Sequence, residues 1–178
     1  MFQNFDNPGD FSESAARIDA LRQVLKDAGV DGFIVPRADE HQGEYIAPSA
    51  ARLEWLTGFS GSAGVAVVLA DRAAILVDGR YTLQVRDQID TGVVTPLSSI
   101  ETPLPAYLES EAAGLRIAYD PWLHTMSEVE RLGRVMAATG GALVALAENP
   151  VDRIWTDRPA PPKVRAFLHG DNLAGKSA

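Results

Sequence analysis

The spacing of apolar residues predicts an amphipathic helix near the start of the chain. Over residues 12–28, apolar side chains recur at three- and four-residue steps, and charged or amide side chains fill the positions between them. Ser12 is expected to cap the first turn and Gly29 to end the helix. The predicted apolar face consists of Ile18, Leu21, Leu25 and Ala28.

Compact apolar runs predict the strands of one sheet. Residues 32–36 (GFIVP) combine β-branched and aromatic side chains and end at a proline, which has no ladder donor. Two runs, 63–69 and 73–77, are separated by only three residues, a spacing that suits a hairpin. Further strands are predicted over residues 93–97, 115–119 and 142–146.

Helices are predicted between these strands. Weaker helical patterns cover residues 80–89 and 103–111, and a clearer one precedes Gly140 and Gly141. In the last helix, Ser127 and Glu130 have the spacing of a capping box. Its apolar stripe consists of Val129, Leu132 and Val135. Strands that alternate with helices, together with one hairpin, predict an α/β domain with a mixed β-sheet flanked by helices.

A linker is predicted near the end of the chain. Residues 157–162 (DRPAPP) contain three prolines, and only sixteen residues follow them, too few to fold alone. We therefore expect one domain over residues 1–158, and a linker with the start of a missing second domain over residues 159–178.

Composition narrows the classes of partner. The chain has 178 residues, 46% hydrophobic, which is enough for one core, and its net charge of -8 opposes binding to nucleic acid or anionic membranes. It has no cysteine, which excludes disulfides and thiolate chemistry and fits a reducing compartment. The N-terminus lacks the pattern of a signal peptide, and no apolar run approaches the roughly 20 residues of a membrane span. We expect a cytoplasmic protein.

Two glycine-containing segments suggest phosphate binding, but their contexts do not support it. Residues 170–177 (GDNLAGKS) match the phosphate-loop pattern, yet the chain ends one residue later, where a helix should follow. Residues 58–64 (GFSGSAG) precede a strand, whereas a dinucleotide-binding loop follows one. We interpret the first segment as a polar linker and the second as a close-packed turn.

Two polar groupings remain as candidate chemistry. His41 and Glu44 are three residues apart, but Tyr45 stands where a second histidine would complete a zinc pattern, so we expect a metal-free turn. Residues 78–81 (DGRY) follow a predicted strand. Arg80 has the donor geometry to bind a carboxylate or carbonyl, and a surface turn in which Asp78 pairs with Arg80 explains the motif equally well.

Five ordered segments of the chain together resemble the N-terminal domain of Xaa-Pro aminopeptidase, in the long three-domain cytosolic form of the creatinase family. The resemblance extends from about residue 17 to residue 159, and Pro150, where an apolar residue is expected, is a small departure. The segments are residues 41–48 (HQGEYIAP), Arg52, residues 57–64 (TGFSGSAG), residues 78–81 (DGRY) and residues 151–159 (VDRIWTDRP).

This resemblance implies a ribonuclease-H-like domain of a metalloaminopeptidase that removes the residue before an N-terminal Xaa-Pro bond. Two divalent ions, usually manganese, would activate water in a C-terminal domain that this chain lacks. The chain itself would hold no metal and no catalytic residue, and alone would be inactive. It would narrow access to the metal site, help to build a homodimer and contact the peptide through Arg80, with Asp78 and Tyr81 holding that turn.

Two alternatives from other classes stay open. The parent protein could be a pseudo-enzyme whose peptidase-like fold recognises a protein partner, or the chain could be a free-standing small-molecule binder. The metal, the preferred first residue of the substrate and any contact of His41 or Asp78 with substrate are not determined by the sequence.

Overall fold

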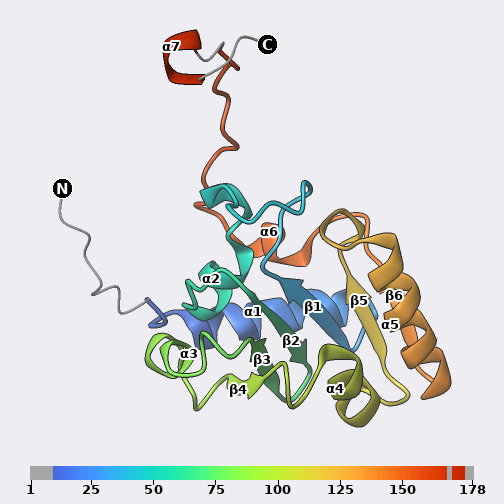
Figure 1. Ribbon diagram of the computed structural model, residues 1–178. Helices are drawn as coiled ribbons and strands as arrows, with labels where there is room; N and C mark the ends of the chain where they lie inside the picture. The colour runs from blue at the N-terminus through green and yellow to red at the C-terminus, as the bar shows by residue number, and fades with distance from the viewer. Residues whose placement is uncertain (1–9, 168–169, 175–178) are drawn as a thin grey trace.

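A six-stranded mixed sheet forms the centre of the protein. The computed structural model describes residues 10–167 and 170–174, and within them the strands are ordered β4-β3-β2-β1-β5-β6 (Figure 1). Strand β2 is antiparallel to both neighbours, and all other pairs are parallel. The predicted mixed α/β sheet is therefore confirmed. The strands are β1 (Gly32–Pro36), β2 (Gly64–Leu69), β3 (Ala73–Val77), β4 (Thr95–Ser98), β5 (Arg116–Tyr119) and β6 (Ala142–Ala145).

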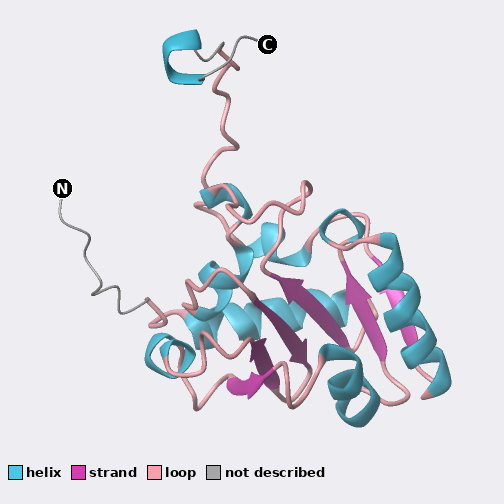
Figure 2. Cartoon of the chain, viewed as in Figure 1, coloured by secondary structure: helices cyan, strands magenta, loops and turns pink. Residues whose placement is uncertain are grey.

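Helices cover both faces of the sheet (Figure 2). The first face packs against α1 (Ser14–Asp27), α2 (Arg52–Thr57), α3 (Gln84–Gln88) and α6 (Pro150–Ile154). The second face packs against α4 (Leu104–Glu111) and α5 (Met126–Ala138). The short helices η1 (Pro48–Ala50) and η2 (Pro121–Leu123) lie in loops, and α7 (Asp171–Ala174) lies in the tail. No helix in these described segments is long and apolar enough to cross a bilayer.

The alternation of side chains explains why the central strands read as continuous apolar runs. Phe33 and Val35 of β1 belong to the core cluster on the α1 face, whereas Ile34 belongs to the cluster on the α4 and α5 face. Successive side chains of a strand point to opposite faces, so a strand covered on both sides has no polar face. All five residues of β3 are buried for the same reason.

The start of α1 differs from the prediction. Ser12 does not cap the helix: its backbone N and its Oγ both donate to Asp10, and the helix begins at Ser14. Ala28 is exposed and follows the last helical residue, so it is not part of the apolar face. The predicted end is confirmed, because Gly29 adopts a φ of +68°, which glycine accommodates without strain.

The predicted capping box of α5 is also wrong. The N-cap is Thr125, whose Oγ1 accepts a hydrogen bond from the backbone N of Glu128 at 3.3 Å, and Ser127 lies inside the helix. The same spacing of hydroxyl and carboxylate occurs two residues earlier, at Thr125 and Glu128, and this pair lies at the start of the helix.

Two other elements are shorter or shifted. Helix α3 covers only Gln84–Gln88, because the turn at residues 78–81 occupies the start of the predicted segment. Strand β4 begins at Thr95, because the backbone N of Val93 and of Val94 donate to the carbonyl of Asp90 in a turn.

Two glycines provide a matched test of this packing. A Cβ added at Gly32 would lie 2.9 Å from the backbone oxygen of Val68 and 2.6 Å from Leu69 Cδ2, whereas one added at Gly133 within α5 would meet nothing within 4 Å. We predict that Gly32→Ala lowers the free energy of unfolding by about 1–3 kcal/mol and that Gly133→Ala raises it by about 0.5–1 kcal/mol. Chemical denaturation of both variants measures these changes, and a destabilised Gly133→Ala would contradict the assigned packing of α5.

Candidate functional site

The sheet brings the ends of most strands to one edge. Because β1 and β3 are both antiparallel to β2, they are parallel to each other, and β4, β5 and β6 share their direction. The loops that follow these strands, and the turn before β2, therefore meet at one edge. Ligands of open α/β sheets bind outside the carboxyl ends of the strands. We call this region the carboxyl edge; it comprises residues 37–47, 58–63, 78–83, 99–103, 120–125 and 146–149.

Arg80 lies on the carboxyl edge, in the turn after β3. Its Nε is 3.1 Å from each carboxylate oxygen of Asp78, and its Nη2 donates to Asp78 Oδ2 at 2.6 Å. The backbone N of Arg80 also donates to Asp78 Oδ1 at 2.9 Å, which fixes the turn. These hydrogen bonds lower the pKa of Asp78 below its ordinary value. The carboxylate thus orients a guanidinium that remains 65% exposed and makes no hydrogen bond through Nη1 within the described residues.

Tyr81 fastens this turn to the glycine-containing segment at residues 58–64. Its hydroxyl is 2.6 Å from Ser62 Oγ, and its ring meets Phe59 edge-on with centroids 5.6 Å apart. A Cβ at Gly61 would lie 2.2 Å from the Phe59 ring, so a side chain cannot be placed there without displacing that ring. The interpretation of residues 58–64 as a close-packed turn is confirmed.

The loop after β1 is ordered by Asp39. This buried carboxylate accepts hydrogen bonds at 3.0 Å from the backbone N of His41 and from that of Gly43. His41 has an 80% exposed side chain, and its Nε2 lies 3.7 Å from Glu40 Oε1. Within residues 10–167 and 170–174, no three or more His, Cys, Asp or Glu residues are grouped so as to hold a metal ion.

A charged network joins segments that are distant in the sequence. The Nε and Nη2 of Arg52 donate to the two carboxylate oxygens of Asp152 at 2.7 and 2.9 Å, although the residues are 100 positions apart. Arg158 Nη1 pairs with the same carboxylate, and Arg158 Nε donates to the carbonyl of Ser49 at 2.7 Å. The network fixes the position at which the chain leaves the folded body.

A buried pair stands beside this network. Asn149 donates through Nδ2 to Asp120 Oδ2 at 2.9 Å and caps α6 by accepting from the backbone N of Val151. Pro150 occupies the first turn of that helix, where its missing N–H has no cost, and this explains the departure from the expected residue.

Two hollows open at or beside the carboxyl edge. One, of about 550 Å³, is lined by the stacked rings of Trp55 and Trp155, by Arg37 and by Phe59, which also contacts Tyr81. The other, of about 590 Å³, lies where the connections from β1 and β5 lead to opposite sides of the sheet, with Trp122 among its lining residues. Both hollows are lined by polar and by apolar side chains, a mixture that is common in ligand-binding sites and in contacts between domains.

The structure unites some of the predicted site residues and not others. Arg80, Asp78, Tyr81 and residues 58–64 form one assembly, whereas His41 stands apart on the neighbouring loop. The phosphate-loop match at residues 170–177 lies partly outside the described residues, with only Gly170 and α7 within them. Sequence reasoning assigned no contact to Asp152 or Asp120: Asp152 lies within the segment at residues 151–159 that carries the resemblance, and Asp120 lies in none of these segments.

The fold defines a class of domain, and comparison with known proteins identifies it. The creatinase/prolidase N-terminal domain family matches residues 17–158. The chain belongs to this family. The predicted resemblance to the N-terminal domain of Xaa-Pro aminopeptidase is therefore confirmed.

The names of curated relatives are more specific than the name of the family. A protein named as a probable Xaa-Pro aminopeptidase P from Paracoccidioides lutzii is 39% identical over 170 residues, which cover 93% of this chain and 27% of that protein. One of the same name from Aspergillus clavatus is 38% identical, with 92% and 26% covered. The chain thus spans about a quarter of the length of the curated relatives that it matches.

Solved structures share the fold. The X-prolyl aminopeptidase of Caenorhabditis elegans, described as a cytosolic enzyme with a di-nuclear active site, superposes with a TM-score of 0.76 at 28% identity, covering 83% of this chain and 26% of that one. The N-terminal domain of the cytoplasmic peptidase PepQ from Mycobacterium tuberculosis superposes with a TM-score of 0.61 at 25% identity, covering 79% and 99%.

The charged network generates a prediction about stability. The Arg52 side chain is only 8% exposed, so Asp152→Ala leaves a nearly buried guanidinium without its partner. We expect the free energy of unfolding to fall by about 3 kcal/mol. The exposed neighbour Asp157 provides the control, since Asp157→Ala should change it by no more than about 0.5 kcal/mol. Equal effects of the two variants in urea denaturation would contradict the role of Asp152.

Proposed function

We propose that this chain is the non-catalytic N-terminal domain of a metal-dependent Xaa-Pro aminopeptidase, in which Arg80 positions the peptide. Three findings support the proposal: the family, the names of the relatives, and an exposed guanidinium that Asp78 orients at the carboxyl edge. The parent enzyme would release the residue before an N-terminal Xaa-Pro bond. The cytosolic description of the Caenorhabditis elegans enzyme favours a cytoplasmic location.

The metal ions belong to the remaining part of the polypeptide in this proposal. The described residues of this chain offer no group of three or more ligands, so no step of the reaction is assigned to a metal held here. The di-nuclear site of the Caenorhabditis elegans enzyme supports two metal ions in the parent, with manganese and a homodimer as further parts of the proposal. Such ions supply an activated water when bound.

The geometry at Arg80 suggests which part of a substrate it contacts. The guanidinium and the Asp78 carboxylate form a locally neutral pair, so the remaining hydrogen-bond donors attract a free anion less strongly than an unpaired arginine does. A backbone carbonyl of the peptide is the matching acceptor. Positioning of this kind lowers the barrier by holding the scissile bond in its reactive orientation, without participation in bond cleavage.

Substitution of Arg80 tests this role in the full-length enzyme. A charge-assisted hydrogen bond contributes about 1.5–3 kcal/mol, so Arg80→Ala should lower kcat/KM for an Xaa-Pro peptide by roughly ten- to a hundredfold. The unfolding transition should stay in place, because Arg80 is exposed. Arg86, an exposed arginine of α3, provides the control, and Arg86→Ala should leave kcat/KM unchanged. Unaltered kinetics of Arg80→Ala would refute the positioning role.

The division of labour is tested by comparing two polypeptides. The full-length protein should hydrolyse Xaa-Pro peptides and lose this activity when a chelator removes its metal, and the 178-residue chain alone should be inactive. A full-length protein that binds metal but hydrolyses no Xaa-Pro peptide would support the pseudo-enzyme alternative. Hydrolysis by the isolated chain, free of other proteases, would disprove its assignment as non-catalytic.

A further inference from the structure

Large apolar side chains project into solvent from two neighbouring loops of the carboxyl edge and from the first residue of α5. Tyr45 is 88% exposed, Trp122 is 74% exposed and Met126 is 82% exposed. Tyr45 follows β1, and Trp122 and Met126 follow β5, the strand paired with β1. We call these three residues the apolar rim. Large exposed apolar side chains at one end of a domain are typical of surfaces that are covered by a partner.

The Tyr45 side of the apolar rim is held in place. Asp39 orders the loop, and Arg37 Nη1 donates to the carbonyl of Glu44 at 2.8 Å. Gln42 has a φ of +54°, and it is the only non-glycine residue with positive φ in the described part of the chain. A conformation of this kind costs on the order of 1 kcal/mol and persists where the surroundings impose it. Tyr45 therefore projects from an ordered loop.

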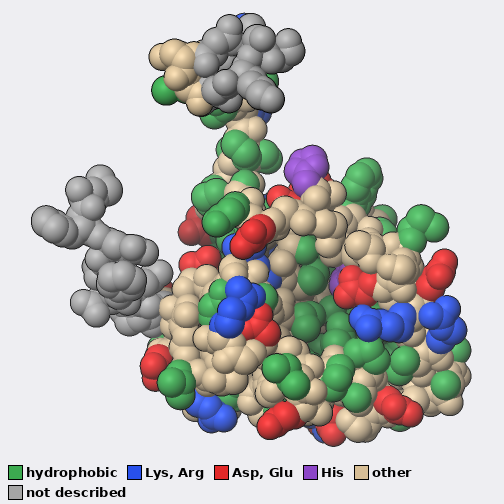
Figure 3. Space-filling model, in the orientation of Figure 1, with side chains coloured by type: hydrophobic (Ala, Val, Ile, Leu, Met, Phe, Trp, Pro, Cys, Tyr) green, Lys and Arg blue, Asp and Glu red, His purple; other side chains and the backbone are tan. Residues whose placement is uncertain are grey.

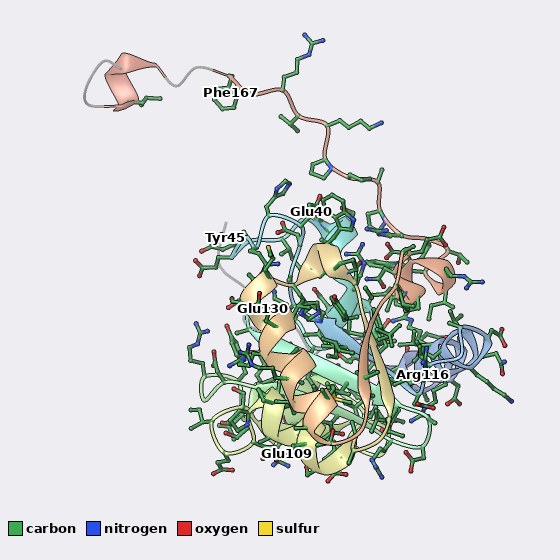
Figure 4. All side chains as sticks on the ribbon, turned by 90° about the vertical axis from the view of Figure 1, so that its right-hand side faces the viewer. Glu40, Tyr45, Glu109, Arg116, Glu130 and Phe167 are labelled. Carbon is green, nitrogen blue, oxygen red and sulfur yellow. The ribbon has the colours of Figure 1, made fainter. Side chains whose placement is uncertain are left out.

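The Trp122 side of the apolar rim is held by a hydrogen bond and by buried neighbours. Asp120 Oδ1 accepts a hydrogen bond from the backbone N of Trp122 at 2.9 Å, and Leu123 and His124 are buried beneath it. Trp122 lines the 590 Å³ hollow together with Glu40 of the Tyr45 loop, so the two sides adjoin. Figure 4 shows Glu40 and Tyr45 at the end of the molecule from which the tail departs, with Glu109 at the opposite end.

The tail leaves the body at this same edge. Arg158 is fixed to Ser49 and Asp152, and residues 159–167 form no helix or strand. Val164 and Phe167 are 87% and 82% exposed, and the tail stands clear of the body in Figure 3. A part of the protein that follows residue 178 is tethered to the body by residues 159–178, which span at most about 70 Å when fully extended. A tether raises the local concentration to the millimolar range, far above that of a second copy in solution.

We propose that the apolar rim is the surface on which the catalytic part of the same polypeptide docks. The inference rests on the proposed function, in which that part exists. The relatives are about three and a half times as long as this chain, so there is sufficient polypeptide to cover the rim. Docking there places the following part of the protein against the loops next to Arg80.

Hydroxyl-radical footprinting tests the proposal directly, because tyrosine, tryptophan and methionine side chains react strongly. The 178-residue chain and the full-length protein are compared at several concentrations. Oxidation of Tyr45, Trp122 and Met126 should be about fivefold slower in the full-length protein at every concentration, because the core of an interface excludes solvent. Equal rates in the two polypeptides would overturn the proposal. Protection that rises with concentration in the isolated chain would overturn it in favour of a second copy.

Charge substitutions provide an independent test in the full-length protein. Trp122→Lys or Tyr45→Lys should accelerate tryptic cleavage after Lys163 and Arg165 about tenfold, because an undocked linker is accessible. Ala113→Lys places the same charge on an exposed residue between α4 and β5, at the opposite edge, and should leave cleavage unchanged. Equal cleavage of all three variants would contradict docking at the rim. In the isolated 178-residue chain, unchanged denaturation midpoints would show that the variants fold.

These outcomes separate the two proposals. Xaa-Pro hydrolysis by a full-length protein whose apolar rim stays reactive would disprove the docking surface and leave the proposed function standing. If the apolar rim is protected from oxidation in a full-length protein that hydrolyses no Xaa-Pro peptide, the proposed function is disproved and the proposed docking surface stands.

Discussion

The direction of a single strand determines where this domain presents its polar loops. Because β2 is antiparallel to both β1 and β3, the other strands share one direction, and their carboxyl ends meet at one edge. The hairpin of β2 and β3 thereby carries Arg80 back to the edge reached by the loop after β1. The helices bury both faces of the sheet, so the loops at its ends carry the exposed polar groups, and Arg80 lies among those of the carboxyl edge.

Asp152 joins the body of the domain to the segment through which the chain leaves it. Its carboxylate binds Arg52 of α2 and Arg158 at the exit of the chain, so the body of the domain and the start of the tail are joined at one charged group. An ion pair of this kind specifies geometry more than it stabilises, because desolvation offsets much of the Coulomb attraction. Here the ion pairs of Asp152 set the direction in which residues 159–167 leave the body. They leave it near both Arg80 and the apolar rim, so the two proposals concern the same end of the domain.

Local pattern was sufficient to predict the six strands, the helices α1, α3, α4 and α5 and the class of fold, but not the short helices α2 and α6 or the contacts between distant residues. The apolar runs at residues 63–69 and 73–77 predicted the hairpin. The apolar stripe that contains Ile18 and Leu21 predicted the face of α1 that packs on the sheet. The start of α5 was misplaced because Thr125 and Ser127 both offer a capping hydroxyl, and only the preceding turn decides between them. The link from Arg52 to Asp152 spans 100 positions and has no local signal. The exposure of Trp122 likewise depends on tertiary packing.

The central claim is that Arg80 of this domain meets a peptide bound by the rest of the protein. A crystal structure of the full-length protein, with a non-hydrolysable Xaa-Pro peptide bound, tests it most directly. The account predicts a guanidinium nitrogen of Arg80 within about 3 Å of a peptide carbonyl oxygen, with the Asp78 pair intact. An Arg80 side chain that points into solvent, with the peptide held entirely by other residues, would contradict it.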